Sequence, residues 1–307
     1  MPRPDLDALA RPSGTFAMLA LDQRESLRTI VAERTRRNVD AVTDDELRAF
    51  KVAAARELTP FASAVLLDAD FGLDPVLDAH ALAAGCGLIV AADALVQAPG
   101  GPVEETDLDD RVTAALAGGA GAAALKLLVL WRADEAAGVV DLARRFVSRC
   151  RSAGLLAVLE PVVRPPRQGS TDAESFDREA AILDAAEALG SLGADLYKAE
   201  VPFRGRGEAA AITAGCRELG ERIRGPWVVL SQGVDLDAFP LAVEAACRGG
   251  ASGFLAGRAI WTDSIGEGGG GALAERLAAV ARPRLEALGG LVDRVGRPWR
   301  EAPGAVP

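Results

Sequence analysis

The chain has 307 residues, half of them hydrophobic and a quarter charged, with a formal net charge of −10. This is ordinary globular composition, in a chain long enough to bury a stable core without disulfide or metal cross-links. The acidic balance argues against a nucleic-acid partner, which requires a clustered basic surface. No apolar run reaches the roughly 18 residues of a membrane span, and the start, MPRPDLDALARPSG, lacks a signal-peptide core. We therefore expect a cytoplasmic protein with no membrane partner.

Two residue types are unusually rare. His80 is the only histidine, and the four cysteines form no CxxC pair, so neither a zinc site nor a disulfide framework is predicted. Of the 34 basic residues only Lys51, Lys126 and Lys198 are lysines. A lysine in a chain that otherwise uses arginine indicates a position that needs an amine able to lose its proton.

Short apolar runs alternate with amphipathic stretches such as DDELRAFKVAAARELTPF. Runs of this near-continuous apolar character are typical of strands covered on both faces, as in a parallel sheet. Eight runs are predicted as strands: 16–22, 62–68, 87–93, 122–131, 155–163, 195–201, 227–233 and 253–261.

Eight strands alternating with helices predict an α/β fold, a (β/α)8 TIM barrel, over residues 1–307 as a single domain. The alternative is an open doubly wound sheet, but no GxGxxG motif follows the first run. The GEGGGG segment at 266–271 is expected to be a loop rather than a phosphate cradle. The Pro- and Arg-rich tail is expected to fray from about residue 296.

Lysines inside two of the predicted strands are the first candidate site residues, because barrel active sites form at the carboxyl ends of the strands. Lys126 and Lys198 interrupt apolar runs, where a lysine is costly unless it is paired or functional. Lys198 is the candidate nucleophile for a Schiff base, and Lys126 is the nearby cation that would favour its free amine. The alternative for either is a structural ion pair with Asp22 or Glu160. Lys51 lies in a helical pattern and is expected on the surface.

Other strand ends also carry polar residues. Glu160 is a candidate general acid–base, or alternatively a charge partner for a lysine. Asp68 and Asp93 are expected to cap helices or anchor loops rather than catalyse. The residues after the seventh and eighth runs lie where barrels commonly bind phosphate: Ser231, Gly233, Gly257 and Arg258.

Six blocks follow one another in the order FAMLALDQRESLR, ALKLLVLWR, LEPVVRPPR, GADLYKAEVP, VVLSQGVD and ASGFLAGRAIW. They resemble the class I aldolase family that includes tagatose-1,6-bisphosphate aldolase, and most of all its sulfofructose-phosphate aldolase branch. The resemblance runs from about Gly14 to about Val292. It implies cleavage of 6-deoxy-6-sulfofructose 1-phosphate into dihydroxyacetone phosphate and 3-sulfolactaldehyde, within sulfoquinovose breakdown. Because such barrels commonly self-associate, a homo-oligomer is expected.

The resemblance also implies catalytic roles. Lys198 matches the Schiff-base lysine, Glu160 the proton-transfer glutamate and Lys126 the lysine near the carbonyl. In this chemistry Lys198 attacks the C2 ketone and the iminium acts as the electron sink, so no metal or other cofactor is expected. A zinc-dependent aldolase would instead use a site built largely from histidines.

Binding residues follow from the same comparison. Asp22 and Gln23 match a pair at the end of the first strand, with Asp22 expected as a further catalytic residue and Gln23 as a binding residue. The phosphate positions match Ser231, Gly233, Gly257 and Arg258. Where the sulfofructose-phosphate branch has Ser-Ser-Gly, this chain has Gln232 in the middle, and the longer amide would alter the anion pocket. Candidates for the anion at C6 are four arginines: Arg24, Arg132, Arg164 and Arg167.

Three alternatives stay open. A tagatose or fructose 1,6-bisphosphate aldolase would use the same chemistry on a different C6 anion. A metal-free sugar-phosphate isomerase would use Glu160 as base without needing Lys198 as nucleophile. A non-catalytic sugar-phosphate-binding barrel would retain Gly257 and Arg258, but it would have no reason to keep a lysine inside the sixth strand.

Overall fold

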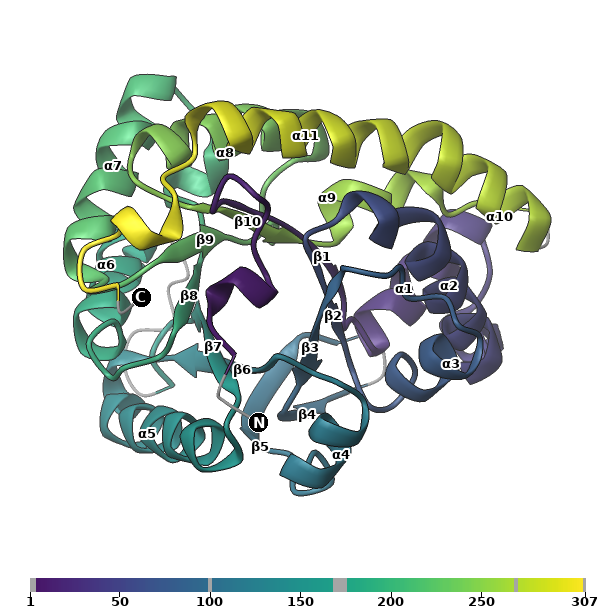
Figure 1. The fold of residues 1–307 in the computed structure, drawn as a ribbon, viewed down its shortest axis with the longest axis horizontal. Helices are drawn as coiled ribbons and strands as arrows, with labels where there is room; N and C mark the ends of the chain where they lie inside the picture. Colours follow the sequence, from purple (N-terminus) through teal and green to yellow (C-terminus); the bar gives the residue numbers. More distant parts are fainter. Residues whose placement is uncertain (1–3, 99–100, 168–175, 268–269, 306–307) are drawn as a thin grey trace.

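A computed structural model describes residues 4–98, 101–167, 176–267 and 270–305. Eight parallel strands close into a barrel in the order β1-β10-β9-β8-β7-β6-β3-β2, as seen in Figure 1. The strands are β1 Phe16–Leu21, β2 Ala64–Leu67, β3 Gly87–Ala91, β6 Ala124–Trp131, β7 Leu156–Val163, β8 Leu196–Ala199, β9 Trp227–Val229 and β10 Gly253–Ala256. Each lies within one of the eight predicted runs, so the predicted barrel is confirmed.

Helices surround the barrel. They are α1 Glu25–Thr35, α2 Asp44–Leu58, α3 Leu73–Asp78, α4 Ala114–Gly119, α5 Ala136–Ala153, α6 Arg178–Leu189, α7 Ala209–Arg222, α8 Phe239–Arg248, α9 Arg258–Trp261, α10 Gly270–Arg276 and α11 Arg282–Val295. A π-helical segment, Leu277–Ala281, joins the last two. The predicted loop at 266–271 lies partly outside the described residues.

The strands have two buried faces, which explains their continuous apolar runs. On β1, Met18 and Ala20 pack inside the barrel, whereas Ala17 and Leu19 pack in the layer between the sheet and the helices. This alternation decides which strand residues can reach a site within the barrel.

An antiparallel hairpin that the sequence reading did not predict follows β3. The predicted strand at 87–93 ends at Ala91, and β4 (Asp93–Gln97) then pairs with β5 (Val103–Leu108). Both hairpin strands contain exposed residues, so their sequences lack the apolar signal of the barrel strands. The hairpin carries Asp93 and Gln97 to the carboxyl end of the barrel.

The eighth predicted run also divides. β10 ends at Ala256, and Arg258–Trp261 forms the short helix α9. Gly257 stands at the junction, close to β1: a Cβ there would lie 2.4 Å from the carbonyl oxygen of Ala20. The Trp261 indole donates a hydrogen bond to the same carbonyl at 3.1 Å.

The sequence predicts a frayed tail from about residue 296, but the described residues up to Ala305 do not fray. Trp299 is buried against Leu6 and Phe16 at the amino end of the barrel. Its backbone N–H donates to Gly14 and its indole to Asp7. The tail therefore covers the barrel end opposite the strand carboxyl termini.

Candidate active site

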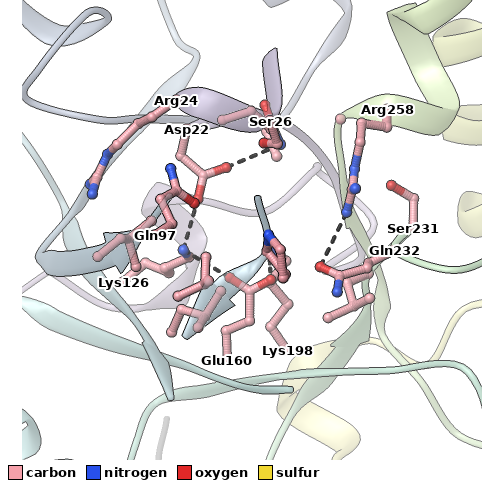
Figure 2. Close-up of a pocket in the computed structure, with 18 of the residues that line it drawn as sticks. Asp22, Arg24, Ser26, Gln97, Lys126, Glu160, Lys198, Ser231, Gln232 and Arg258 are labelled. Carbon is pink, nitrogen blue, oxygen red and sulfur yellow. Dashed lines mark hydrogen bonds and ion pairs between the residues drawn. The ribbon is translucent and has the colours of Figure 1, made fainter. Parts of the chain in front are cut away.

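A cavity of about 230 Å³ lies at the carboxyl ends of the barrel strands. Figure 2 shows Asp22, Lys126, Glu160 and Lys198 converging, with Arg24 and Gln97 on one side and Ser231, Gln232 and Arg258 on the other. The predicted residues that line it are Asp22, Gln23, Arg24, Lys126, Glu160, Arg164, Lys198, Ser231, Gly257 and Arg258.

Lys198 points into the barrel because its neighbours on β8 point outward. Tyr197 and Ala199 pack in the layer under the helices. The Lys198 side chain is 5% exposed, and its Nζ lies 2.7 Å from Oε1 of Glu160. This contact is the ion pair expected of a structural lysine and also the geometry for proton exchange between an amine and a carboxyl group.

Lys126 has three carboxylate partners. Its Nζ lies 2.7 Å from Asp22, 2.8 Å from Asp93 and 2.9 Å from Oε2 of Glu160. The contact with Asp93 is also a hydrogen bond, and the other two are ion pairs. Glu160 therefore holds one lysine on each oxygen.

The charges around Lys126 decide its protonation. Burial alone would lower the pKa of Lys126, but attraction by Asp22, Asp93 and Glu160 outweighs it and raises the pKa well above its ordinary value. Burial would likewise raise the pKa of Asp22, but the charges of Lys126 and Lys198 hold that pKa well below its usual range. Lys126 is therefore an ammonium and Asp22 a carboxylate at neutral pH.

Asp93 is not the helix cap or loop anchor that the sequence predicts. It is 1% exposed and binds Lys126 and Arg24. Arg24 in turn bridges Asp93 at 3.1 Å and Asp70 at 3.2 Å. Arg24 lines the cavity as expected, but its charge is already balanced by carboxylates.

The structure places only some of the predicted phosphate-binding residues at the cavity. Arg258 is partly buried and has no carboxylate at ion-pair distance among the described residues, and burial, opposed by attraction from Asp22 and Glu160, lowers the pKa of its guanidinium. Its Nη2 donates to Oε1 of Gln232 at 3.1 Å. Ser231 and Gly257 line the same cavity, but Gly233 does not. Gly233 has a φ of +78° and adjoins the Arg204 side chain, so the turn after β9 directs it away.

The four arginines predicted for the C6 anion separate into two groups. Arg24 and Arg164 line the cavity, whereas Arg132 and Arg167 do not. Arg132 donates to the carbonyl of Pro165, and Arg167 pairs with Glu135 at 2.8 Å. The sequence predicts all four arginines at the site because each follows a barrel strand. Strand order alone does not show in which direction a loop side chain points, so the prediction is wrong for two of them.

The sequence reading missed two polar residues that line the cavity. Ser26 lies in the first turn of α1, and Gln97 ends β4. Ser26 follows the Asp22-Gln23-Arg24 segment closely enough to have been considered. Gln97 had no signal, because its position depends on the unpredicted hairpin.

Lys51 is not on the surface, contrary to prediction. It is fully buried on α2, where it forms an ion pair with Asp68 and lies 5.8 Å from the centre of the Phe71 ring. Asp68 also accepts hydrogen bonds from the backbone of Asp70 and Phe71. Asp68 is thus a loop anchor, as predicted, but one that also neutralises a buried lysine.

In the part of the chain that the structure describes, no group of three or more His, Cys, Asp or Glu side chains is arranged to hold a metal ion. The carboxylates of Asp22, Asp93 and Glu160 surround the Lys126 ammonium instead. No described helix is both long and apolar enough to cross a membrane.

Sequence relatives were found over nearly the whole chain. The model of the DeoC/LacD family aldolases matches residues 16–263. A tagatose 1,6-diphosphate aldolase from Listeria monocytogenes is 29% identical over 96% of this chain and 92% of its own length. A relative of the same name from Streptococcus agalactiae is 26% identical, over 96% and 97%.

Solved structures share the fold. A fructose-bisphosphate aldolase from Plasmodium falciparum superposes with a TM-score of 0.64 at 15% identity, covering 95% of this chain and 93% of its own. An archaeal fructose-1,6-bisphosphate aldolase, whose catalytic lysine is covalently bound to a carbinolamine intermediate, gives 0.58 at 14% identity, covering 94% and 98%. These likenesses support the barrel, and the family match carries the activity. The chain is a class I aldolase, a carbon–carbon lyase, of the DeoC/LacD family.

Proposed function

We propose that Lys198 is the Schiff-base nucleophile of this aldolase. The observation that carries the proposal is the 2.7 Å contact between Lys198 Nζ and Glu160 Oε1, inside a cavity that also contains the buried guanidinium of Arg258. Glu160 takes a proton from the Lys198 ammonium, and the free amine attacks the C2 ketone of the sugar. The C2 oxygen then takes one proton from the attacking nitrogen and the proton held by Glu160, and it leaves as water, which gives the iminium and restores the Glu160 carboxylate.

Cleavage uses the same two residues. Glu160 accepts the proton of the C4 hydroxyl, the C3–C4 bond breaks, and its electron pair moves into the iminium to form an enamine. The aldehyde leaves, the enamine is protonated at C3, and hydrolysis of the new iminium releases dihydroxyacetone phosphate. Lys126 stays protonated and holds the other oxygen of Glu160, which favours the carboxylate that must accept the proton.

The proposed substrate is 6-deoxy-6-sulfofructose 1-phosphate. Arg258 and Arg164 are the two arginines of the cavity without a carboxylate at ion-pair distance among the described residues. Arg258, with Ser231 and Gly257, suits the C1 phosphate. Among the described residues, that leaves for the C6 anion one guanidinium without a carboxylate partner, Arg164, which also donates to the Val163 carbonyl, and the amides of Gln23 and Gln97. A sulfonate carries one negative charge and phosphate about −1.5 to −2, so this set favours a sulfonate.

The second candidate is a tagatose or fructose 1,6-bisphosphate. It is supported by the curated relatives at 26–29% identity, which are named tagatose 1,6-diphosphate aldolases. The two candidates share every chemical step and differ only at C6.

Two measurements test this function. Borohydride reduction in the presence of dihydroxyacetone phosphate should give a stable adduct on Lys198, located by peptide mass spectrometry. Steady-state kinetics on the sulfonate and both bisphosphates should give a kcat/KM at least about tenfold higher for the sulfonate, or roughly 1.4 kcal/mol. Equal or faster cleavage of a bisphosphate would assign that sugar instead, and an adduct on another lysine would overturn the role of Lys198.

A further inference from the structure

We propose that Arg24 and Asp93 are a positioning pair that holds the Lys126 ammonium against Glu160 during catalysis. The inference rests on the proposed roles of Lys198 and Glu160. It assigns a role to the Asp93 carboxylate and the Arg24 guanidinium, neither of which carries out a step of the proposed reaction.

Asp93 is fixed from several directions. Its Oδ2 accepts hydrogen bonds from Lys126 Nζ at 2.8 Å and from the Leu128 backbone at 3.1 Å. Its Oδ1 accepts from Arg24 Nη2 at 3.1 Å, and its backbone carbonyl accepts from Arg24 Nη1 at 2.9 Å. A buried carboxylate with these partners has little freedom to move.

Arg24 binds Asp93, so its guanidinium is not available as the main binding group for a ligand. Its side chain is 8% exposed, and both terminal nitrogens donate to Asp93. Its Nε lies 3.2 Å from Asp70. The guanidinium therefore links the start of α1 to the start of the β4–β5 hairpin.

The need for such a pair follows from the three acceptors of Lys126. Asp22 contacts Lys126 from the end of β1, Asp93 from β4 and Glu160 from β7. Among the described residues, the other cations that form ion pairs with these carboxylates are Lys198, at Glu160, and Arg24, at Asp93. Glu160 exchanges protons in the proposed reaction, so the strength of its ion pair with Lys126 changes during the catalytic cycle. Asp93 has no role in those proton transfers, and Arg24 fixes its orientation through two hydrogen bonds. Without Asp93, the ammonium would lose one acceptor and be drawn toward Asp22, away from Glu160.

Asp93→Asn is the direct test because asparagine has the same shape. Its carbonyl oxygen can still accept from Arg24, but its NH2 group cannot accept from Lys126. We expect kcat to fall about 10- to 100-fold, as for partners that orient metal ligands, with KM changed less than about threefold. The alkaline limb of the kcat pH profile should move to lower pH, because Lys126 loses part of the negative charge that retains its proton.

Two further variants keep the test decisive. Arg24→Gln leaves Lys126 untouched and should shift the alkaline limb in the same direction but less. Its effect should be non-additive with that of Asp93→Asn in a double-mutant cycle. Asp70→Asn is the matched control, since Asp70 contacts Arg24 but not Lys126, and its kcat and pH profile should stay within about twofold of the wild type. If Asp93→Asn does not fold, as judged by thermal melting, Arg24→Gln carries the test alone.

The results separate this inference from the proposed function. If the alkaline limb of the kcat pH profile is unchanged in Asp93→Asn, the positioning role is overturned, even if kcat has fallen through a structural effect. Where only Arg24→Gln folds, the same outcome in that variant overturns it. Failure to trap Lys198 with borohydride in the wild type would overturn the proposed function instead. A borohydride adduct on Lys198 and sugar cleavage in the wild type, together with a shifted alkaline limb in the variants, would support both the proposed function and the positioning role.

Discussion

Lys126 and Lys198 bind opposite oxygens of one carboxylate, at 2.9 Å and 2.7 Å from Glu160. This arrangement gives the two lysines different tasks. Lys126 is surrounded by three carboxylates that retain its proton, whereas Lys198 has Glu160 alone at ion-pair distance among the described residues. The proposal that Lys198 is the nucleophile uses this difference in the number of acidic partners.

Lys198→Arg should abolish carbon–carbon cleavage and leave the fold intact. Arginine keeps the positive charge next to Glu160 but cannot lose its proton or form an imine. Activity assays with thermal melting as the folding control would check this. Residual cleavage within about tenfold of the wild type, equivalent to roughly 1.4 kcal/mol of barrier, would refute the assignment.

Glu160→Gln should reduce kcat about 10²- to 10⁴-fold, the usual contribution of a positioned acid–base group. Glutamine still fits between Lys126 and Lys198, but it cannot exchange a proton. Prolonged incubation with dihydroxyacetone phosphate and borohydride should still modify Lys198 in this variant. Wild-type turnover would mean that another group carries out the proton transfers.

Gln232→Glu should weaken binding of the phosphorylated sugar rather than chemistry. The new carboxylate would replace the amide oxygen that already contacts Arg258 at 3.1 Å, and it would compete with the substrate phosphate as an ion-pair partner. We expect KM to rise about tenfold, or roughly 1.4 kcal/mol, with kcat changed much less. Gln232→Ser is the control, since it adds no charge. A KM for Gln232→Glu equal to that of Gln232→Ser would argue that Arg258 does not bind the phosphate.

Stability should fall at both ends of the pH range. Asp22 has a lowered pKa when folded, so its contribution is present above about pH 4, its ordinary value, and is lost as pH falls through the folded pKa. Lys126 has a raised pKa, so its contribution is present below about pH 10.4 and is lost as pH rises through the folded pKa. Urea unfolding across pH would measure both, and Asp22→Asn should lose stability less steeply in acid than the wild type does. Identical acid limbs would contradict the role of Asp22.

Lys51→Met should destabilise the protein by about 3–5 kcal/mol, because it leaves Asp68 buried without a cation. Adding Asp68→Asn should recover much of that loss, since the amide oxygen can still accept from the loop backbone. Denaturant unfolding of the single and double variants would give the coupling energy. Because Lys51 lies outside the cavity, kcat at a temperature where the variants stay folded should match the wild type. A single variant as stable as the wild type would show that the pair contributes nothing.

Several features of this protein follow from the sequence alone. Continuous apolar runs report strands buried on both faces, and their alternation with helical patterns led to the barrel. Since the carboxyl ends of parallel barrel strands meet on one face, Lys126, Glu160 and Lys198 were expected together before any coordinates. The burial of Lys51 was predicted wrongly, although the pattern holds a signal for it, because Leu47, Phe50, Lys51 and Ala54 share one face of α2 at helical spacing.

Other features depended on tertiary structure. Hydrophobic periodicity indicates which face of an element is buried, but not which polar group it meets there. The β4–β5 hairpin has partly exposed, polar strands, so nothing in its sequence showed that it would bring Asp93 to Lys126 and Gln97 to the cavity. Whether a rim arginine is free or already neutralised likewise depends on loop geometry. Arg24 meets Asp93 and Asp70, whereas Arg164 meets no carboxylate among the described residues, and this difference exists only in the folded chain because its partners are brought together from separate loops.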